Sequence, residues 1–365
     1  MSIKISRHLK NPIIKTTDVK PSRLDFHVDG AFNAGVTEYK GETILLLRVA
    51  ESVKTDNELE VKLPFLEKNK DNKYSLTVKT LHKENDAHLY DFSDSRVILN
   101  RKDNPKTVYL TSLSHLRIAR STDGVHFEVE DKPFIFPEGK YETWGIEDPR
   151  ITKMEDWYYI NYTAVSKLGA ATALIRTRDF IDYERMGIIF PPENKDVSIF
   201  PEKINGKYIA YHRPVPKAFG NPDIWIATSD DLLTWGNHQH LLSVAEDDNW
   251  ENGRIGGGAP SFKTEKGWVH IYHAADKDHR YCLGAFITDL NDPSNIIAKT
   301  SKPILEPTAD YEKYGFFGQV VFTCGVTVKE NHVKIYYGAS DEVMALAEIT
   351  IDELYVALGL EDEEE

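Results

Sequence analysis

The sequence is poor in cysteine and has no long apolar run and no export signal. Its 365 residues include only Cys282 and Cys324, both within predicted strands, so we expect buried free thiols rather than a disulfide. No run approaches the roughly 18 apolar residues of a membrane-spanning helix, and no basic, hydrophobic leader opens the chain. We therefore expect a cytoplasmic protein with no membrane partner.

Basic residues are also scarce. Lysine and arginine number 44 against 58 aspartates and glutamates, which gives a net charge of −14. Nucleic-acid binding needs basic patches that displace counterions, so this balance argues against a nucleic-acid partner. The sequence also lacks metal-ligand spacing, a phosphate-binding glycine-rich loop and a Ser-His-Asp signature. We expect no metal and no cofactor.

Helical periodicity is missing except at residues 351–360, where a short C-terminal helix is predicted before the acidic tail of residues 361–365. The chain has a repeat instead: a turn, then a run of β-branched and aromatic residues that ends on a polar side chain. Strand-only repeats of this size are typical of propeller blades. The copies are GETILLLRV from Gly41, DWYYINYTA from Asp156, GKYIAYHRP from Gly206, GWVHIYHAA from Gly267 and HVKIYYGASD from His332.

Two further patterns accompany the repeat. One follows the first four copies, as LRIARSTDGVHF from Leu116, TALIRTRDFIDY from Thr172, DIWIATSDDLLTW from Asp223 and, in a weaker form, CLGAFITDLND from Cys282. The first of these lies far behind its copy, and the other three lie close behind theirs. The other pattern precedes the repeat, as AGVTEY at Ala34, DPRITK at Asp148, FPEKI at Phe200, APSFK at Ala259 and CGVTVK at Cys324. We predict an all-β fold in which residues 1–365 form a single five-bladed β-propeller domain, with an insertion at about residues 53–111 in the first blade.

The polar endings of the five copies are candidates for a shared pocket. In a propeller, equivalent strand ends converge on the mouth of the central channel. For any one of these residues, a surface side chain or a satisfied buried one is the plainer interpretation, and the set matters because its members recur at equivalent positions. The residues are Arg48, Tyr162, His212 with Arg213, Tyr272 with His273, and Asp341.

The strongest single motif is Gly-Ile-Glu-Asp-Pro-Arg at residues 145–150. Pro149 restricts the conformation of Asp148 before it and would hold that carboxylate in a fixed direction, although a simple Asp-Pro turn is the alternative. Lys195, Arg213 and His273 would form a cationic group of the kind that holds phosphate through charge-assisted hydrogen bonds.

These motifs together resemble glycoside hydrolase family 130, which consists mainly of β-mannoside phosphorylases built on a five-bladed propeller. The resemblance extends from about Asn11 to Glu348. It rests on GIEDPRIT, DGAFNAGV from Asp29, NKDVSIFPEK from Asn194, the HRP triplet at 212–214, GGGAP from Gly256 and YYGASD from Tyr336.

The resemblance implies a role for each candidate residue. Asp148 would be the sole catalytic acid, and its proton would reach the glycosidic oxygen through the 3-hydroxyl of the mannosyl unit. Inorganic phosphate would be the co-substrate, bound by Lys195, Arg213, His273 and Tyr272. The sugar would be bound by Asn33, Arg48 and Asp341, with His212 and Arg150 as further candidates.

One carboxylate beside a cationic cradle favours inverting phosphorolysis, because a hydrolase needs a second carboxylate to activate water, whereas phosphate needs only positioning. The predicted reaction converts a β-mannoside and phosphate into α-mannose 1-phosphate and a shortened sugar. A hydrolytic β-mannosidase stays open, with Glu147 or Glu202 as the base. So does a sugar-binding propeller without turnover.

The sequence indicates the reaction more clearly than it indicates which glycosidic linkage of the β-mannoside is cleaved. The chain looks closer to the β-1,2-mannobiose and β-1,2-oligomannan phosphorylases than to the β-1,4 enzymes, which remain the alternative. Aromatic residues that could stack on an acceptor sugar are Trp144, Trp250, Tyr311 and Phe316, each of which could equally anchor a loop or the core. A homodimer is compatible with the sequence.

Overall fold

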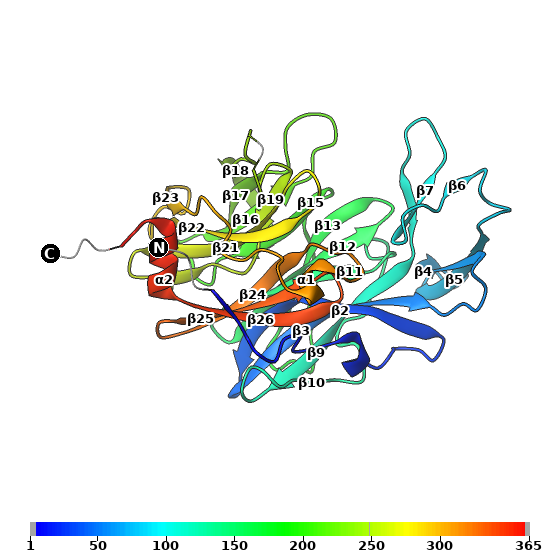
Figure 1. Cartoon of the computed structure of the whole chain (residues 1–365), viewed down its shortest axis with the longest axis horizontal. Coiled ribbons are helices and arrows are strands. Elements are labelled where there is room, and N and C mark those ends of the chain that lie inside the picture. Colours follow the sequence, from blue (N-terminus) through cyan, green and yellow to red (C-terminus); the bar gives the residue numbers. More distant parts are fainter. Residues whose placement is uncertain (1–4, 248, 362–365) are drawn as a thin grey trace.

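The computed structural model of this protein describes residues 5–247 and 249–361, and their regular structure is mostly β-strand (Figure 1). Within these residues, antiparallel strands form four sheets of four strands, one sheet of five and two smaller sheets. The all-β prediction is confirmed. Residues 362–365, most of the predicted acidic tail, lie outside the described residues.

The first two large sheets are antiparallel meanders, and in the first of them a long segment connects β3 to β9. Sheet one contains β2 (Phe26–Tyr39), β3 (Glu42–Val53), β9 (Ser112–Ser121) and β10 (Glu128–Val129). Sheet two contains β11 (Ile146–Met154), β12 (Trp157–Ser166), β13 (Gly169–Thr177) and β14 (Glu184–Phe190).

The next sheets repeat this plan. Sheet three contains β15 (Asn194–Ile199), β16 (Tyr208–Pro214), β17 (Ile224–Ser229) and β18 (Trp235–Leu242). Sheet four contains β19 (Arg254–Gly257), β20 (Phe262–Thr264), β21 (Gly267–Ala275), β22 (Tyr281–Thr288) and β23 (Ile296–Lys299). Sheet five contains β24 (Val321–Lys329), β25 (His332–Ala339), β26 (Val343–Thr350) and the N-terminal β1 (Ser6–Arg7).

The five sequence repeats occupy β3, β12, β16, β21 and β25, the strands that follow the first strand of each sheet. The pattern predicted to precede them is only partly right. Its copies at Ala34, Asp148 and Cys324 lie in β2, β11 and β24, but the copy at Phe200 is wrong because β15 already ends at Ile199. Pro201 follows and has no N–H to donate to a ladder.

The segment between β3 and β9 forms the two smaller sheets. One pairs β4 (Glu60–Lys68) with β5 (Tyr74–His82), and the other contains β6 (Tyr90–Asp91), β7 (Val97–Asn100) and β8 (Thr107–Leu110). In Figure 1 they lie at the end of the molecule opposite α2. The helices are α1 (Asp310–Lys313), α2 (Ile351–Leu358) and a 3-10 turn at Thr16–Asp18. Helix α2 begins with Thr350 accepting from the Glu353 N–H and ends at Gly359, whose φ is 71°.

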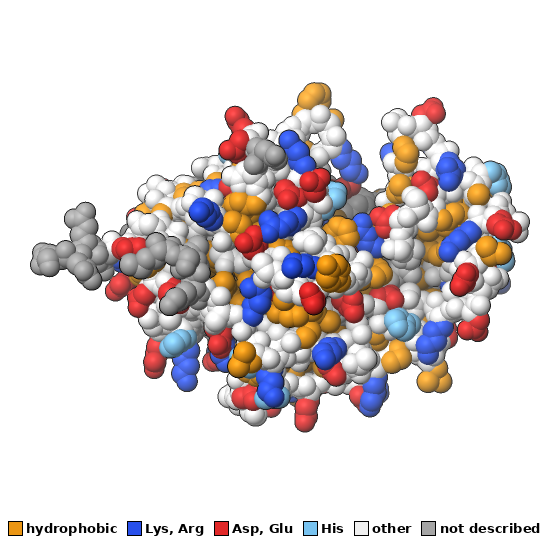
Figure 2. All heavy atoms as spheres, in the orientation of Figure 1, with side chains coloured by type: hydrophobic (Ala, Val, Ile, Leu, Met, Phe, Trp, Pro, Cys, Tyr) orange, Lys and Arg blue, Asp and Glu red, His pale blue; other side chains and the backbone are white. Residues whose placement is uncertain are grey.

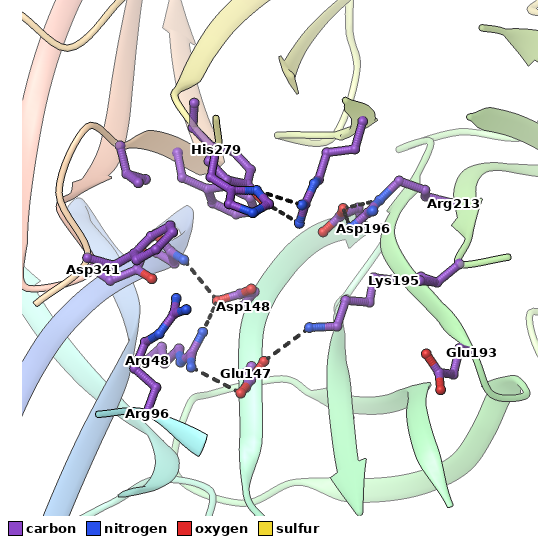
Figure 3. Close-up of a pocket in the computed structure, with 17 residues that line it drawn as sticks. Arg48, Arg96, Glu147, Asp148, Glu193, Lys195, Asp196, Arg213, His279 and Asp341 are labelled. Atoms are coloured by element: carbon purple, nitrogen blue, oxygen red, sulfur yellow. Dashed lines mark hydrogen bonds and ion pairs between the residues drawn. The ribbon is translucent and has the colours of Figure 1, made fainter. Parts of the chain in front are cut away.

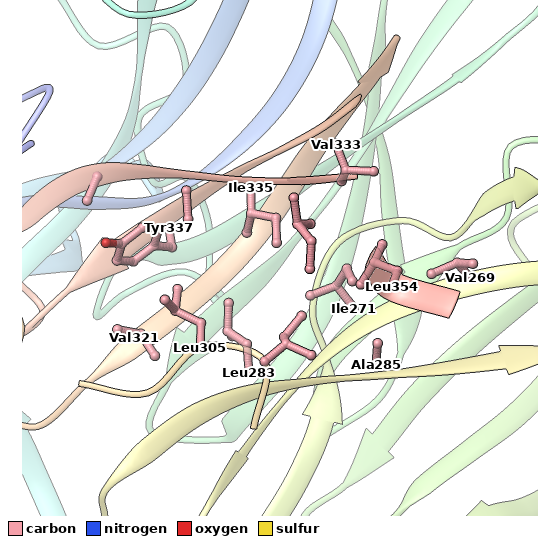
Figure 4. Packing of buried hydrophobic residues seen from close by; sticks show 14 of the residues in the cluster. Val269, Ile271, Leu283, Ala285, Leu305, Val321, Val333, Ile335, Tyr337 and Leu354 are labelled. Carbon is pink, nitrogen blue, oxygen red and sulfur yellow. The ribbon is translucent and has the colours of Figure 1, made fainter. Parts of the chain in front are cut away.

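The hydrophobic core is divided into clusters between neighbouring sheets. Ile44 of sheet one packs with Ile160 of sheet two, and further clusters join sheets two to three, three to four and four to five. Another cluster joins sheet five back to sheet one through Tyr336 and Leu47. Figure 4 shows the cluster between sheets four and five, where Leu354 of α2 lies near Ile271. Each sheet is therefore packed on both faces, as its alternating apolar residues require.

The two ends of the described chain meet in sheet five, where β1 pairs with β26. Arg7 of β1 donates to the buried Glu312 carboxylate at 2.7 and 2.9 Å. The thiols of Cys282 and Cys324 are both buried and unpaired, which confirms that prediction. No helix in the described part of the chain is long and apolar enough to cross a membrane. Acidic and basic side chains are interspersed over the face seen in Figure 2.

Candidate active site

A pocket of about 380 Å³ is lined by residues from all five large sheets and from the segment between β3 and β9 (Figure 3). Its lining is dominated by charged side chains. The acidic ones are Glu147, Asp148, Glu193, Asp196 and Asp341, and the basic ones are Arg48, Arg96, Lys195, Arg213 and Arg254.

Three polar residues of this lining each lie where the pairing of two strands shifts register, at similar places in three consecutive sheets. The pairing of β2 with β3, of β11 with β12 and of β15 with β16 shifts register once near the pocket. The residues at these shifts have positive φ: Asn33 (48°), Asp148 (50°) and Asp196 (54°). Asn and Asp adopt this left-handed conformation more readily than most side chains, and a bulge re-aims the side chain that it carries. The fold thus turns all three into one pocket.

The Asp148 carboxylate is held from one side. Its Oδ1 accepts from Asn33 Nδ2 at 3.0 Å and from Arg48 Nη1 at 3.2 Å. Burial raises the pKa of Asp148, but the positive charges of Arg48, Arg150 and Lys195 outweigh burial and bring it below its ordinary value. Without a ligand, this carboxyl is therefore ionised at neutral pH.

Glu147 neighbours Asp148 and is engaged by two cations. Its carboxylate accepts from Arg48 Nη2 at 3.0 Å and lies 3.5 Å from Lys195 Nζ. The interpretation of Glu147 as a partner of a nearby arginine is confirmed. Glu202, the other candidate base, is outside the pocket lining and pairs on the surface with Lys263 at 2.8 Å.

Asp196 is a central residue that the sequence analysis did not single out. Its buried carboxylate takes two bonds from Arg213, at 2.7 Å from Nε and 2.6 Å from Nη2. It also accepts from His273 Nε2 at 3.1 Å and from Arg150 Nη2 at 3.3 Å. Burial raises the pKa of Asp196, but Arg213, His273 and Arg150 together lower it well below its usual value.

The predicted residues fall into three groups. Those that line the pocket are Asn33, Arg48, Asp148, Lys195, Arg213 and Asp341. Those that lie directly behind its wall, in contact with Asp196, are Arg150 and His273. Those that the fold directs elsewhere are Tyr162, His212 and Tyr272, whose polar atoms bond to Glu142, Asn194 and Glu251 respectively.

Strand geometry explains this division. Successive residues of a strand point to opposite faces, so Arg213 and its neighbour His212 cannot both face the pocket. The same holds for His273 and Tyr272. Of the proposed stacking aromatics, Trp250 packs against Tyr272 with ring centroids 5.8 Å apart, and neither it nor Trp144, Tyr311 or Phe316 lines the pocket.

Several lining residues have no equivalent in the sequence prediction. Arg96 reaches the pocket from the segment between β3 and β9 and lies 4.1 Å from the ring centroid of Phe317. Arg254, His279 and Tyr281 come from sheet four and the turn before β22. Asp196 could have been found by aligning EDPRI with KDVSI, but the predicted strand at Phe200 concealed that match.

Comparisons with known proteins relate the whole chain to a family of mannoside phosphorylases. Residues 88–358 match a family model described as beta-1,4-mannooligosaccharide phosphorylase. A beta-1,2-mannobiose phosphorylase of Listeria innocua is 49% identical, over 98% of this chain and 99% of that protein. A 1,2-beta-oligomannan phosphorylase of Thermoanaerobacter sp. is 42% identical, over 72% of this chain and 88% of that protein.

A solved structure shows the same relationship in three dimensions. The Listeria innocua beta-1,2-mannobiose phosphorylase in complex with beta-1,2-mannobiose superposes with a TM-score of 0.92 at 48% identity, covering 98% of this chain and 99% of that one. With the sequence motifs, the family model and these relatives in agreement, the chain belongs to glycoside hydrolase family 130.

Proposed function

We propose that this protein is a β-mannoside phosphorylase that acts on β-1,2-mannobiose or β-1,2-oligomannan and releases α-mannose 1-phosphate with inversion. The observation that carries the proposal is the position of Asp148 in one pocket with the cations Lys195 and Arg213. The names of the two relatives described above support the β-1,2 linkage. The family model's name keeps β-1,4-mannosides as the alternative substrate.

We also propose that the five large sheets are the blades of one propeller, spanning the chain, with the segment between β3 and β9 as an insertion in the first blade. Support comes from the apolar clusters that join each sheet to the next and sheet five to sheet one. The pocket would then be the mouth of the central channel. A cytoplasmic location remains part of the proposal.

In the proposed reaction, phosphate binds between Lys195 and Arg213 and attacks the anomeric carbon from the face opposite the leaving sugar. Asp148 supplies the proton to the glycosidic oxygen, through the 3-hydroxyl of the bound mannose. Asn33, Arg48 and Asp341 hold that mannose. Because phosphate already carries charge, the protein needs to position it and not to deprotonate it.

Asp148 must gain a proton before it can act as an acid, because the cations around it favour the ionised form. Binding of phosphate adds negative charge beside Lys195, and the sugar removes water from the carboxyl. Both changes raise the pKa of Asp148. The acid would therefore form only when both substrates are bound.

Hydrolysis is the less favoured function. Glu147 is held by Arg48 and Lys195, and Glu202 lies outside the pocket, so neither is free to activate water. A non-catalytic sugar-binding role would not require the two cations of sheet three, Lys195 and Arg213, in the pocket.

The test is product analysis with β-1,2- and β-1,4-mannobiose, each with and without inorganic phosphate. Mannose 1-phosphate that forms only with phosphate supports the proposal, and the disaccharide consumed identifies the linkage. Equal release of free mannose without phosphate would refute it. Asp148→Asn should reduce turnover roughly 10²- to 10⁴-fold while β-mannobiose still binds in calorimetry. A variant with full turnover would remove Asp148 from the mechanism.

A further inference from the structure

We propose that Arg150 is a positioning residue for Asp148, whose backbone carbonyl it holds, and is not itself a ligand of the sugar. The inference rests on the proposed function, because it concerns the residue that would act as the acid in that reaction. It gives Arg150 a different role from the sugar binding that the family resemblance implied.

Asp148 lies on a bulge at which the strand ladder is interrupted. The pairing of β11 with β12 shifts register between Glu147 and Arg150 and passes over Asp148 and Pro149. Asp148 has a φ of 50°, which is the left-handed conformation, and Pro149 carries no N–H. The Asp148 carbonyl therefore needs a hydrogen-bond donor from outside the ladder.

Arg150 supplies that donor. Its Nη1 donates to the Asp148 carbonyl oxygen at 2.9 Å. The rest of the guanidinium is held by sheets three and four. Nη2 donates to the Gly257 carbonyl at 2.8 Å and to Asp196 Oδ1 at 3.3 Å, and Nε donates to the Gly258 carbonyl at 3.1 Å. One side chain thus fixes the Asp148 bulge relative to two neighbouring sheets.

The same bonds leave little of Arg150 for a substrate. A guanidinium has five N–H donors, and the four bonds above take up most of them. Arg150 is 1% exposed and lies outside the pocket lining. A sugar hydroxyl would have to displace a carbonyl from a buried charge, which is costly. Arg48, by contrast, reaches the Asp148 carboxylate from within the pocket (Figure 3).

The bulge of the neighbouring sheet is held in a similar way. The pairing of β15 with β16 shifts register between Lys195 and Ser198, and the Val197 carbonyl in that bulge accepts from Asn161 Nδ2 at 2.8 Å. Asn161 is the residue of β12 that pairs with Arg150. Two adjacent buried side chains therefore each hold the backbone of one bulge, which supports a positioning role for both.

Arg150 also acts on Asp148 through its charge. Burial raises the pKa of Asp148, and the positive charges of Arg48, Arg150 and Lys195 more than offset burial. Loss of the Arg150 charge would therefore raise that pKa. The other charged or titratable groups that face this pair are Glu147 on the same strand, Asp196 of sheet three, His270 and His273 of sheet four, Cys324 of sheet five and Asp341 of the turn after β25.

The experiment compares Arg150→Lys and Arg150→Gln with the wild type in phosphorolysis of the mannobiose that the wild type consumes, at saturating phosphate. Lys keeps the positive charge without the planar fork, whereas Gln loses the charge as well. Both variants should lower kcat roughly 10- to 100-fold, because the bulge that aims Asp148 is no longer fixed. The KM for the mannobiose should stay within roughly threefold of the wild-type value, since no contact with the sugar is removed.

The dependence of kcat on pH separates the effect of charge from that of geometry. In the proposed reaction Asp148 must be protonated, so kcat falls at alkaline pH where Asp148 loses its proton in the substrate complex. Arg150→Gln should move this alkaline limb to higher pH, because the pKa of Asp148 rises. Arg150→Lys should leave the limb near its wild-type position. A change that only loosened the fold would lower kcat without moving the limb.

Arg117→Gln is the matched control. Arg117 is also fully buried, donates to the Lys20 carbonyl and lies outside the pocket lining. Its loss should destabilise the protein and leave kcat, the mannobiose KM and the alkaline limb unchanged. Thermal melts of all variants show which are folded, and each kcat is referred to the folded protein.

The inference is overturned if a folded Arg150 variant keeps the wild-type kcat, raises the mannobiose KM beyond the stated range, or loses no more kcat than Arg117→Gln. It is also overturned if the alkaline limb of folded Arg150→Gln does not move. If only Arg150→Lys folds, its kcat and KM decide the question; if neither variant folds, Arg150 serves the fold alone and the inference fails. A wild-type protein without phosphorolysis would instead refute the proposed function, so the two failures are distinguishable.

Discussion

The Asp341→Asn substitution should make the protein more stable at neutral pH while it removes a sugar contact. Asp341 lies in the turn between β25 and β26 and lines the pocket. Its surroundings oppose ionisation: burial, Asp148 and Glu147 together raise its pKa from 3.8 to about 6, although Arg48 and Arg96 act in the other direction. The ionised carboxylate at neutral pH is therefore a cost to the fold.

The size of that cost follows from the pKa. The difference between 3.8 and about 6 corresponds to at most about 3 kcal/mol, at about 1.4 kcal/mol per tenfold change in proton affinity. Because solvent in the pocket screens part of this, we expect Asn to stabilise the protein by about 1–3 kcal/mol at pH 8. For 365 residues, unfolding entropy of about 2.1 cal/mol/K per residue converts this to a Tm increase of about 1–4 °C.

The pH dependence has a definite sign. The folded protein holds the Asp341 proton more tightly than the unfolded chain does, so the stability from this group is complete below pH 3.8 and is lost as the pH rises through about 6. The amide of Asn cannot lose a proton. About half of the advantage of the variant should therefore disappear when the pH is lowered from 8 to 5.

The assay is a pair of thermal melts, wild type and Asp341→Asn, at pH 8 and pH 5 in the same salt. Asp71→Asn removes a charge from an exposed turn and is the matched control, with no expected change in Tm. In the activity assay, Asp341→Asn should raise the KM for the mannoside at least about tenfold through the lost charged hydrogen bond. An Asp341→Asn protein that melts at or below the wild-type temperature at pH 8, or whose advantage is the same at both pH values, refutes the reasoning.

Three further predictions concern a closely packed glycine, the ion pair of the N-terminal strand and the two cysteines. Gly256→Ala should weaken phosphate binding and destabilise the protein by about 1–3 kcal/mol, since the new Cβ would overlap a carboxylate oxygen at 2.4 Å; Gly236→Ala, with open space around it, is the control and should match the wild type in both assays. Arg7→Ala should lower stability by about 2 kcal/mol in urea unfolding because Glu312 stays buried without its cation; an unchanged midpoint would show that β1 does not hold the two chain ends together. Both cysteine thiols should be inert to a thiol reagent in the native protein and react after unfolding, because burial raises the pKa of each; stoichiometric native labelling would contradict this.

The strands could be predicted because their signal is local. Alternating β-branched and aromatic residues bounded by turns located the main repeated strand of every large sheet, and the helical periodicity of residues 351–360 located α2. The first strands were harder to find where bulges interrupt the alternation. This is why the strand at Asn194–Ile199 was misplaced and Asp196, on its bulge, was missed.

The candidate site could be predicted only in part, for a similar reason. The motifs around Asp148 and Lys195 identified residues that do line the pocket. At the strand ends the motifs indicated two neighbouring residues, such as His212 with Arg213. Neighbouring side chains in a strand point to opposite faces, so only one of the two can face the pocket. The sequence did not indicate that His273 would be turned toward Asp196, because that contact joins residues 77 positions apart.

The amino-acid sequence by itself determined the β-class of the fold, the repeat of its sheets and the family, because these depend on local periodicity and on short motifs. Only the tertiary structure decided which side chains meet. Bulges in β2, β11 and β15 turn Asn33, Asp148 and Asp196 into one pocket, and Arg254 arrives there from a fourth sheet. Such convergence depends on how distant strands pack together, and spacing along the chain does not encode it.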